Sequence, residues 1–73
     1  MDSDLSSKPS GFEGTINGYQ GDEFIQLRLV ELGFVRGEKI KILRFTPFGD
    51  PIVTTRGATV ALRREEANCL IVS

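Results

Sequence analysis

The stretch that decides the fold is residues 38–56, which read EKIKILRFTPFGDPIVTTR. Ile40 and Ile42 alternate with lysines, and this pattern is typical of a β-strand with one buried face and one solvated face. The alternation changes phase at Leu43, which indicates a β-bulge or a strand that bends between two faces. A second, β-branched strand follows over residues 52–56. The stretch therefore predicts two antiparallel strands, of which the first is bent, as small barrels require.

The connection between the two strands is TPFGDP, residues 46–51. Pro47 suits the second position of a turn, Gly49 can adopt a positive φ, and Pro51 forces the preceding Asp50 to be extended. These local rules account for the backbone of the loop. They do not account for Phe48, whose ring can either pack under the loop onto the barrel or anchor a partner.

Before this hairpin, GDEFIQLRLVELG predicts a helix over residues 22–32. Asp22 can cap its first turn, and Gly33 suits a left-handed stop. An alternating strand is the competing interpretation, but the leucine-rich content and the two end signals favour the helix. Its apolar positions at helical spacing are Ile25, Leu29 and Leu32.

Leu27 and Val30 point away from that apolar stripe of the predicted helix. A helix that is apolar on two sides is either enclosed between two layers or offers one side to a partner. In a domain of this size we expect another segment of the chain to cover them, with an exposed partner-binding face as the alternative.

The rest of the chain supplies further short elements. We expect strands over residues 14–19, 58–62 and 69–72, and a helical turn over residues 63–68 that Asn68 closes in the left-handed region. Residues 1–11 consist mainly of Ser, Asp, Lys, Pro and Gly, with one leucine, and predict a flexible tail before a domain that spans residues 12–73. Five short strands and one early helix predict a mainly β protein, a small antiparallel barrel with a helical insertion after the first strand.

Composition excludes several classes of protein. The chain has 73 residues, a formal net charge of −1, one cysteine (Cys69) and no histidine. It can form neither a disulfide framework nor a zinc-type Cys/His cluster, and we expect no metal site, no cofactor and no catalysis. The charge gives no field that would attract nucleic acid, and no apolar run approaches the roughly 18 residues that span a bilayer. The N-terminus has no features of a signal peptide, so the expected location is the cytoplasm.

Three motifs in order resemble the FeoA family of ferrous iron transport proteins. The first is Leu32-Gly33-Phe34 followed by Gly37, the second is the loop from Pro47 to Pro51, and the third is Leu62-Arg63 with Glu66-Ala67 before a strand from Leu70 to Val72. The resemblance covers roughly residues 12–73. It implies an SH3-like β-barrel and a cytosolic role beside FeoB, the membrane ferrous iron transporter with a GTPase region. Similar modules form the C-terminal domain of metal-dependent repressors, and the lack of a preceding DNA-binding domain argues against that role.

From these observations we expect a non-enzymatic module that binds the cytoplasmic part of the transporter. The expected contact surface combines the outer side of the helix, the corner at residues 34–37 and the hairpin loop, with contacts from Leu27, Val30, Phe34, Arg36 and Phe48. Regulation of the transporter's GTP hydrolysis, in which an arginine such as Arg36 or Arg63 would assist, is the alternative. Self-association through the apolar surface is a third hypothesis.

The remaining charged residues have simpler interpretations. We expect Arg63 and Arg64 to pair with the neighbouring glutamates or with carbonyl groups, and Cys69 to be a buried core thiol. Lys39, Lys41 and Arg44 lack the interleaved aromatic residues of single-strand binders, so we interpret them as a solvated strand face that protects a sheet edge.

Overall fold

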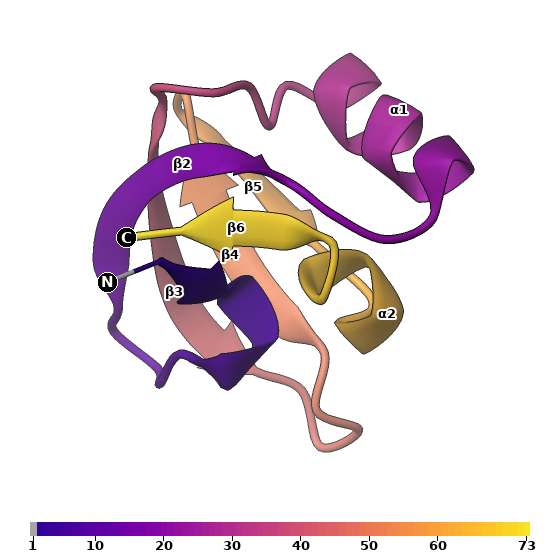
Figure 1. The fold of residues 1–73 in the computed structure, drawn as a ribbon. Helices are drawn as coiled ribbons and strands as arrows, with labels where there is room; N and C mark the ends of the chain where they lie inside the picture. The colour runs from indigo at the N-terminus through magenta and orange to yellow at the C-terminus, as the bar shows by residue number, and fades with distance from the viewer. Residues whose placement is uncertain (1) are drawn as a thin grey trace.

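The computed structural model describes residues 2–73 (Figure 1). Its elements in chain order are β1 (Ser3–Asp4), the 3-10 helix η1 (Leu5–Ser7), β2 (Glu13–Tyr19), α1 (Glu23–Glu31), β3 (Lys39–Phe45), β4 (Pro51–Thr55), β5 (Ala58–Ala61), α2 (Arg64–Ala67) and β6 (Leu70–Val72). The strands expected at residues 14–19, 38–46, 52–56, 58–62 and 69–72 are confirmed within a residue or two at each end. The expected helix at residues 22–32 and the helical turn at residues 63–68 are confirmed as well.

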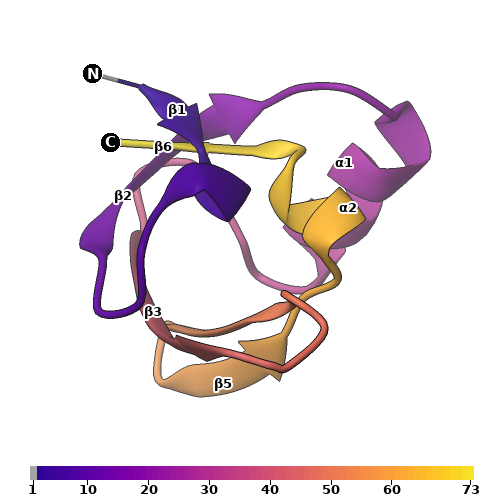
Figure 2. The ribbon, with the colours of Figure 1, turned by 90° about the horizontal axis from the view of Figure 1, so that it is seen from below.

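The six strands form one antiparallel sheet in the order β1-β6-β2-β3-β4-β5. The sheet curls around the core (Figure 2), and both helices lie on one side of the molecule. Within residues 2–73, β1 and β5 are the two edges of this sheet and do not pair with each other. The mainly β fold with an inserted helix is confirmed, but the sheet is a strongly curled open barrel rather than a closed one.

Two β-bulges produce the curl. The pairing of β3 with β4 shifts between Ile42 and Arg44, where the sequence predicted a bulge from the phase change at Leu43. The pairing of β2 with β6 shifts between Ile16 and Gly18. An extra residue on one strand bends that strand and increases its twist, so a short sheet can wrap around a single core.

The strand β3 lies in the middle of the sheet, because it pairs with β2 on one side and β4 on the other. Lys39, Lys41 and Arg44 are exposed, as expected of a solvated face. The interpretation that they protect an edge was wrong, since the period-2 pattern shows which face is wet but not where a strand stands in the sheet.

The N-terminal segment differs from the expectation of a flexible tail. Ser3 and Asp4 pair with Ile71 and Val72, so β1 extends the sheet beyond β6. Leu5, in η1, has no exposed surface and belongs to the core. The segment is mostly polar, but the pairing of β1 with β6 and the burial of Leu5 hold it against the rest of the domain.

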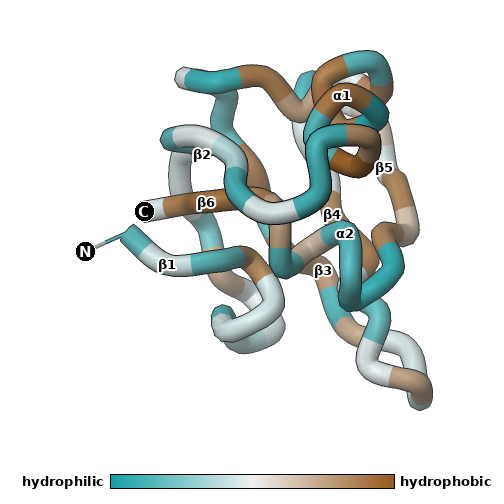
Figure 3. Tube along the Cα trace, turned by 45° about the vertical axis from the view of Figure 1, so that its right-hand side comes forward, coloured by the Kyte–Doolittle hydropathy of each residue, from teal (hydrophilic) through white to brown (hydrophobic). Residues whose placement is uncertain are grey.

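The core consists of apolar side chains from η1, both α-helices, the strands β2, β3, β4 and β6, and the segments between them. Its fully or nearly fully buried members are Leu5, Ile16, Leu29, Phe34, Ile40, Ile42, Val53, Leu62, Ala67, Cys69, Leu70 and Val72. The buried core thiol expected at position 69 is confirmed. In Figure 3 the strand β6 is apolar along its length, in keeping with its position between β1 and β2.

Local signals set the ends of both helices. The Asp22 carboxylate accepts hydrogen bonds from the N–H groups of Phe24 (2.8 Å) and Ile25 (3.1 Å), which makes it the predicted N-cap of α1. Gly33 follows α1 with a φ of 101°, as predicted. The left-handed conformation predicted for Asn68 was wrong, because its φ is −61° and it ends α2 in the right-handed region.

Candidate functional site

Three apolar side chains of α1 are exposed to solvent and form what we call the α1 stripe. Phe24 is 86% exposed, Leu27 58% and Val30 41%. They are spaced by three residues, so they follow one another along the surface of the helix. Scattered exposed apolar residues are ordinary, but an aromatic and two aliphatic side chains in one row make a contiguous apolar patch.

The stripe is exposed because the opposite side of α1 already meets the rest of the chain. Leu29 is fully buried, and it lies about 160° around the helix axis from Leu27. On a third side, Arg28 forms an ion pair of 3.2 Å with Glu66 of α2. The expectation that another segment would cover Leu27 and Val30 was therefore wrong, and the alternative of an exposed face holds for residues 2–73.

Phe24 was missed from the sequence, although it has the greatest exposure of the three. Its position at i−3 from Leu27 and i−6 from Val30 is the signal that could have identified it. The predicted buried face of this helix consists of Ile25, Leu29 and Leu32. Of these Leu29 is buried, Ile25 is half-buried, and Leu32 is 45% exposed.

The loop between β3 and β4 holds Phe48 out in solvent, where its side chain is 83% exposed. Thr46 fixes the loop: its hydroxyl oxygen accepts hydrogen bonds from the N–H groups of Phe48 (3.3 Å) and Asp50 (3.1 Å). Its carbonyl oxygen accepts another from Gly49 at 2.9 Å, and Gly49 has a φ of 88°. The turn expected from the sequence is present, and the open question about Phe48 is answered: the ring points outward.

The corner at residues 34–37 is part of the core rather than of a contact surface. Phe34 has no exposed area, and its carbonyl oxygen accepts a hydrogen bond of 2.7 Å from the Tyr19 hydroxyl. Phe34 as a contact residue was therefore wrong. The side chain of Arg36 is exposed and lies over Gly18, with a guanidinium nitrogen 3.4 Å from the place where a Cβ would stand.

The five predicted contact residues do not form one surface. Figures 1 and 3 show α1 and the loop between β3 and β4 at opposite ends of the molecule, with α2 between them. Leu27 and Val30 belong to the α1 stripe together with Phe24, and Phe48 stands apart on the α2 side, where Arg64 approaches Gly49. The strongest candidate interaction site is therefore the α1 stripe.

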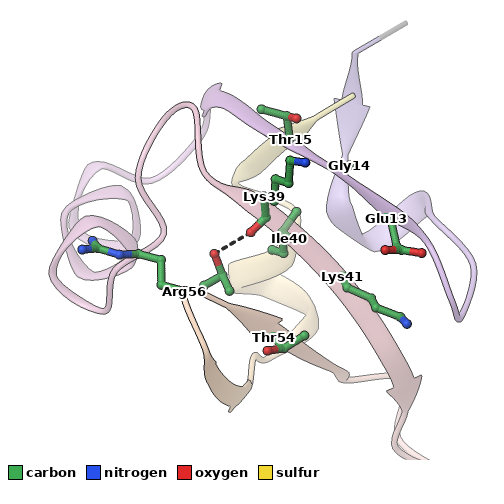
Figure 4. A pocket seen from close by; sticks show the side chains of 9 residues that line it. Glu13, Gly14, Thr15, Lys39, Ile40, Lys41, Thr54 and Arg56 are labelled. Carbon is green, nitrogen blue, oxygen red and sulfur yellow. Dashed lines mark hydrogen bonds between the residues drawn. The ribbon is translucent and has the colours of Figure 1, made fainter.

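The surface has two shallow grooves, one beside the α1 stripe and one on the sheet. One, of about 480 Å³, lies between α1 and α2 and is lined by Phe24, Ile25, Arg28, Arg63, Glu65 and Glu66. The other, of about 450 Å³, crosses β2, β3 and β4 and is lined mainly by polar side chains (Figure 4). There the Thr55 hydroxyl donates to the Lys39 carbonyl oxygen at 2.7 Å, and Arg56 is directed away from Lys39 and Lys41. The cations of this groove do not converge on a common point.

The arginines near α2 bond differently from the expectation. The backbone N–H of Arg63 donates to the Glu66 carboxylate at 2.8 Å, and the backbone N–H of Arg64 donates to the Asp50 carboxylate at 3.1 Å. The ion pair of Glu66 is with Arg28. The cation that pairs with Glu66 is therefore Arg28 of α1, which is distant in sequence, and not the neighbouring Arg63 or Arg64.

Metal-binding chemistry has little support among the described residues. Over residues 2–73, no three His, Cys, Asp or Glu side chains converge as metal ligands. Cys69 is 6% exposed, and its thiol contacts the Glu65 carbonyl oxygen at 3.5 Å. The absence of an iron site remains a prediction, as does the absence of catalysis.

Comparisons with known proteins agree with the resemblance in the sequence. The family model of the FeoA domain matches residues 4–73. The search of the curated proteins finds no match. No helix in the described part of the chain has the length and apolar character to cross a bilayer.

Solved structures include several similar proteins. The FeoA protein from Chlorobium tepidum is 36% identical, with a TM-score of 0.83 over 94% of this chain and 67% of that chain. The FeoA of Stenotrophomonas maltophilia, a prokaryotic SH3 domain protein complexed with zinc, is 31% identical, with a TM-score of 0.82 over 96% of this chain and 88% of that chain. A manganese-dependent transcriptional repressor, 20% identical with a TM-score of 0.87 over 97% of this chain and 40% of that one, shares the fold.

The family model begins at Asp4, so β1 and η1 lie almost entirely within the matched region rather than before it. The predicted SH3-like fold is confirmed by these relatives. Together, the match over nearly the whole chain and the shared fold show that this chain belongs to the FeoA family of SH3-like ferrous iron transport accessory proteins.

Proposed function

We propose that this protein works in the cytoplasm as an interaction module, without catalysis or cofactor of its own, that binds the cytoplasmic GTPase region of an FeoB-type ferrous iron transporter. The observation that carries the proposal is the α1 stripe, a row of exposed apolar side chains on a helix whose opposite side is buried at Leu29 and whose Arg28 pairs with Glu66. Burying such a row against a partner removes apolar area from water, and exposed aromatic side chains are common anchors of interfaces.

The matched residues Leu27 and Leu43 allow a direct test. Both are leucines with comparable exposure, 58% and 45%, but Leu27 lies in the α1 stripe and Leu43 lies at the bulge of β3. Leu27→Ala should weaken binding to the purified cytoplasmic region of the transporter about tenfold, and Leu43→Ala should leave it unchanged. The titration is measured by calorimetry in the nucleotide-free, GDP and GTP-analogue states.

Two results would contradict the proposal. The first is no binding of the native protein in any nucleotide state. The second is equal weakening by the two alanine substitutions, which would mean that α1 is not the contact. Circular dichroism of both variants, which should match that of the native chain, excludes unfolding as the cause of any loss.

Regulation of the transporter's GTP hydrolysis is the second candidate function. The Stenotrophomonas relative is discussed as a bacterial ferrous iron transport activating factor. In this chain Arg63 is exposed and lines the groove between α1 and α2 beside Phe24, while the nearby Glu66 is occupied by Arg28. A GTPase assay with and without the native protein decides the matter: no acceleration ends the hypothesis, and acceleration that Arg63→Ala abolishes supports it.

A further inference from the structure

We infer that the segment which the α1 stripe accepts is a cationic amphipathic helix, with an apolar row flanked by Lys or Arg. This inference rests on the proposed function and specifies the chemistry of the partner at that surface. The charges around the stripe, together with its apolar side chains, define this chemistry.

Two carboxylates flank the centre of the stripe. Glu23 and Glu31 are four residues before and four residues after Leu27, so they are its neighbours on the helix surface, one turn to each side. Both are exposed. Over residues 2–73 neither one has a cationic side chain within 4.0 Å, since the two ion pairs found there involve Arg28 with Glu66 and Arg56 with Glu38.

The cation of α1 is already engaged in an ion pair at the Phe24 end of the stripe. Arg28 is the only basic residue between Glu23 and Glu31 in the sequence, and it pairs with Glu66 of α2. In the groove beside Phe24, Arg63 lies with two carboxylates, Glu65 and Glu66. The exposed face of α1 therefore combines an apolar row with two uncompensated negative charges. Electrostatic complementarity selects a partner of opposite sign and suppresses partners of the same sign.

A membrane surface is a poor occupant for this face. Helices that lie on bilayers carry Lys and Arg beside their apolar side, because the cytoplasmic leaflet is anionic. On α1 the flanking residues are glutamates, which the headgroups would repel. The apolar row alone would favour insertion, but its flanks oppose it.

A second copy of the chain is also a poor occupant. A two-fold pair is built from the same patch on both molecules. Antiparallel packing of two α1 helices would place Glu23 of one copy near Glu31 of the other, and parallel packing would place like residues together. Either arrangement brings carboxylates against carboxylates, while the Arg28 of each copy is already paired with Glu66.

A cationic segment of a membrane transporter fits on physical grounds. Membrane proteins concentrate Lys and Arg on the cytoplasmic side, close to the ends of their spanning helices. A helix of nine residues, such as α1, is about 13 Å long. Its stripe can therefore cover about two to three turns of a partner helix through apolar contacts at i, i+3 and i+7.

The test uses two synthetic amphipathic helical peptides of 15 residues with the same leucine positions. One peptide has lysines beside the leucines and the other has glutamates, so the two differ only in charge. Titration into the isotopically labelled full chain should show at least tenfold tighter binding of the lysine peptide at low salt, with the largest chemical-shift changes at the stripe. The preference should shrink in 0.5 M salt, since screening weakens surface charge pairs.

Charge reversal on the protein provides the matched variants. Glu31→Lys lies in the last turn of α1, where a cation suits the helix dipole, so this variant should fold at least as well as the native chain. It should lose about tenfold in affinity for the lysine peptide and gain affinity for the glutamate peptide. Glu13→Lys, an exposed charge reversal on β2, is the control and should change neither affinity.

Several outcomes would overturn the inference: equal affinity for both peptides, no binding of either, sedimentation of the protein with anionic vesicles, or a dimer in solution that Leu27→Ala disrupts. A parallel titration with the transporter's cytoplasmic side separates the two proposals. If the native protein binds and Glu31→Lys binds equally well, the proposed function holds and this inference fails. If the native protein does not bind the transporter at all, the proposed function fails.

Discussion

Replacing Leu5 with alanine tests the least expected part of the fold, the packing of the N-terminal segment. Leu5 has no exposed surface and lies in η1, which contacts β6 and α2. Removing a fully buried leucine side chain costs about 2–5 kcal/mol, depending on how far the surroundings collapse into the space. Because Leu5 lies on a short segment near a chain end that can relax, we expect a loss of about 2–3 kcal/mol.

That loss is large relative to the stability of so small a domain. At about 0.05–0.15 kcal/mol per residue, 73 residues give a free energy of unfolding of about 4–11 kcal/mol. In a domain of this size each kcal/mol moves the melting temperature by about 4–8 °C. Leu5→Ala should therefore lower the melting temperature by about 10–20 °C, and it should leave the native circular dichroism spectrum unchanged at low temperature.

Urea unfolding, monitored by circular dichroism, measures the loss directly, and Leu43→Ala provides the control. Leu43 is 45% exposed, so its removal should cost less than about 1 kcal/mol. A loss below about 1 kcal/mol for Leu5→Ala, comparable to the control, would refute the argument. It would mean that residues 3–7 do not hold the position over the open end of the barrel that the structure gives them.

Three further substitutions test other features. Phe48→Ala should change the free energy of unfolding by less than about 0.5 kcal/mol, because the ring is 83% exposed; a loss of several kcal/mol in chemical denaturation would mean that the ring is part of the core. Gly14→Ala should cost about 1–3 kcal/mol, because the new carbon would stand 2.4 Å from an aromatic carbon and from a carbonyl oxygen. Gly18→Ala meets only a guanidinium group at 3.4 Å, and equal melting temperatures for the two glycine variants would contradict the predicted contact. Asp22→Ala should cost about 1 kcal/mol by removing the N-cap of α1, whereas Asp22→Asn, which keeps an acceptor oxygen, should retain most of the stability in the same melt.

Local patterns predicted most of the framework because each one acts over a few residues. The phase change at Leu43 identified a bulge that the strand pairing contains. The cap at Asp22 and the stop at Gly33 identified the two ends of α1. The turn around Gly49 followed from the conformations that proline and glycine allow.

Features that depend on distant parts of the chain could not be read in this way. The pairing of Ser3 with Val72 joins the two ends of the described chain, and Leu5 is buried next to that pairing, in η1, which contacts β6 and α2. The exposure of Leu27 depends on which side of α1 meets the sheet and α2. The burial of Phe34 depends on the path of the chain from α1 into β3.

The candidate site shows the same division. Sequence patterns identified Leu27, Val30 and Phe48 as candidates, and all three are exposed. The distance of Phe48 from Leu27 and Val30 could not be predicted. It depends on the position of α2, a later segment of the chain that lies between α1 and the loop between β3 and β4. Arg28, the basic residue of α1, pairs with Glu66 rather than with Glu23 or Glu31, and this choice depends on how α1 packs on α2.

The pairing of β1 with β6 has a practical consequence for engineering this protein. Because Ser3 lies opposite Val72, both ends leave the molecule on the side away from α1, as Figures 1 and 2 show. A fluorescent reporter or a surface tether attached at either end would therefore leave the helix face free. A short linker could also join the ends into a circular permutant, with new termini at the tight turn of Arg56 and Gly57, where both residues have positive φ values.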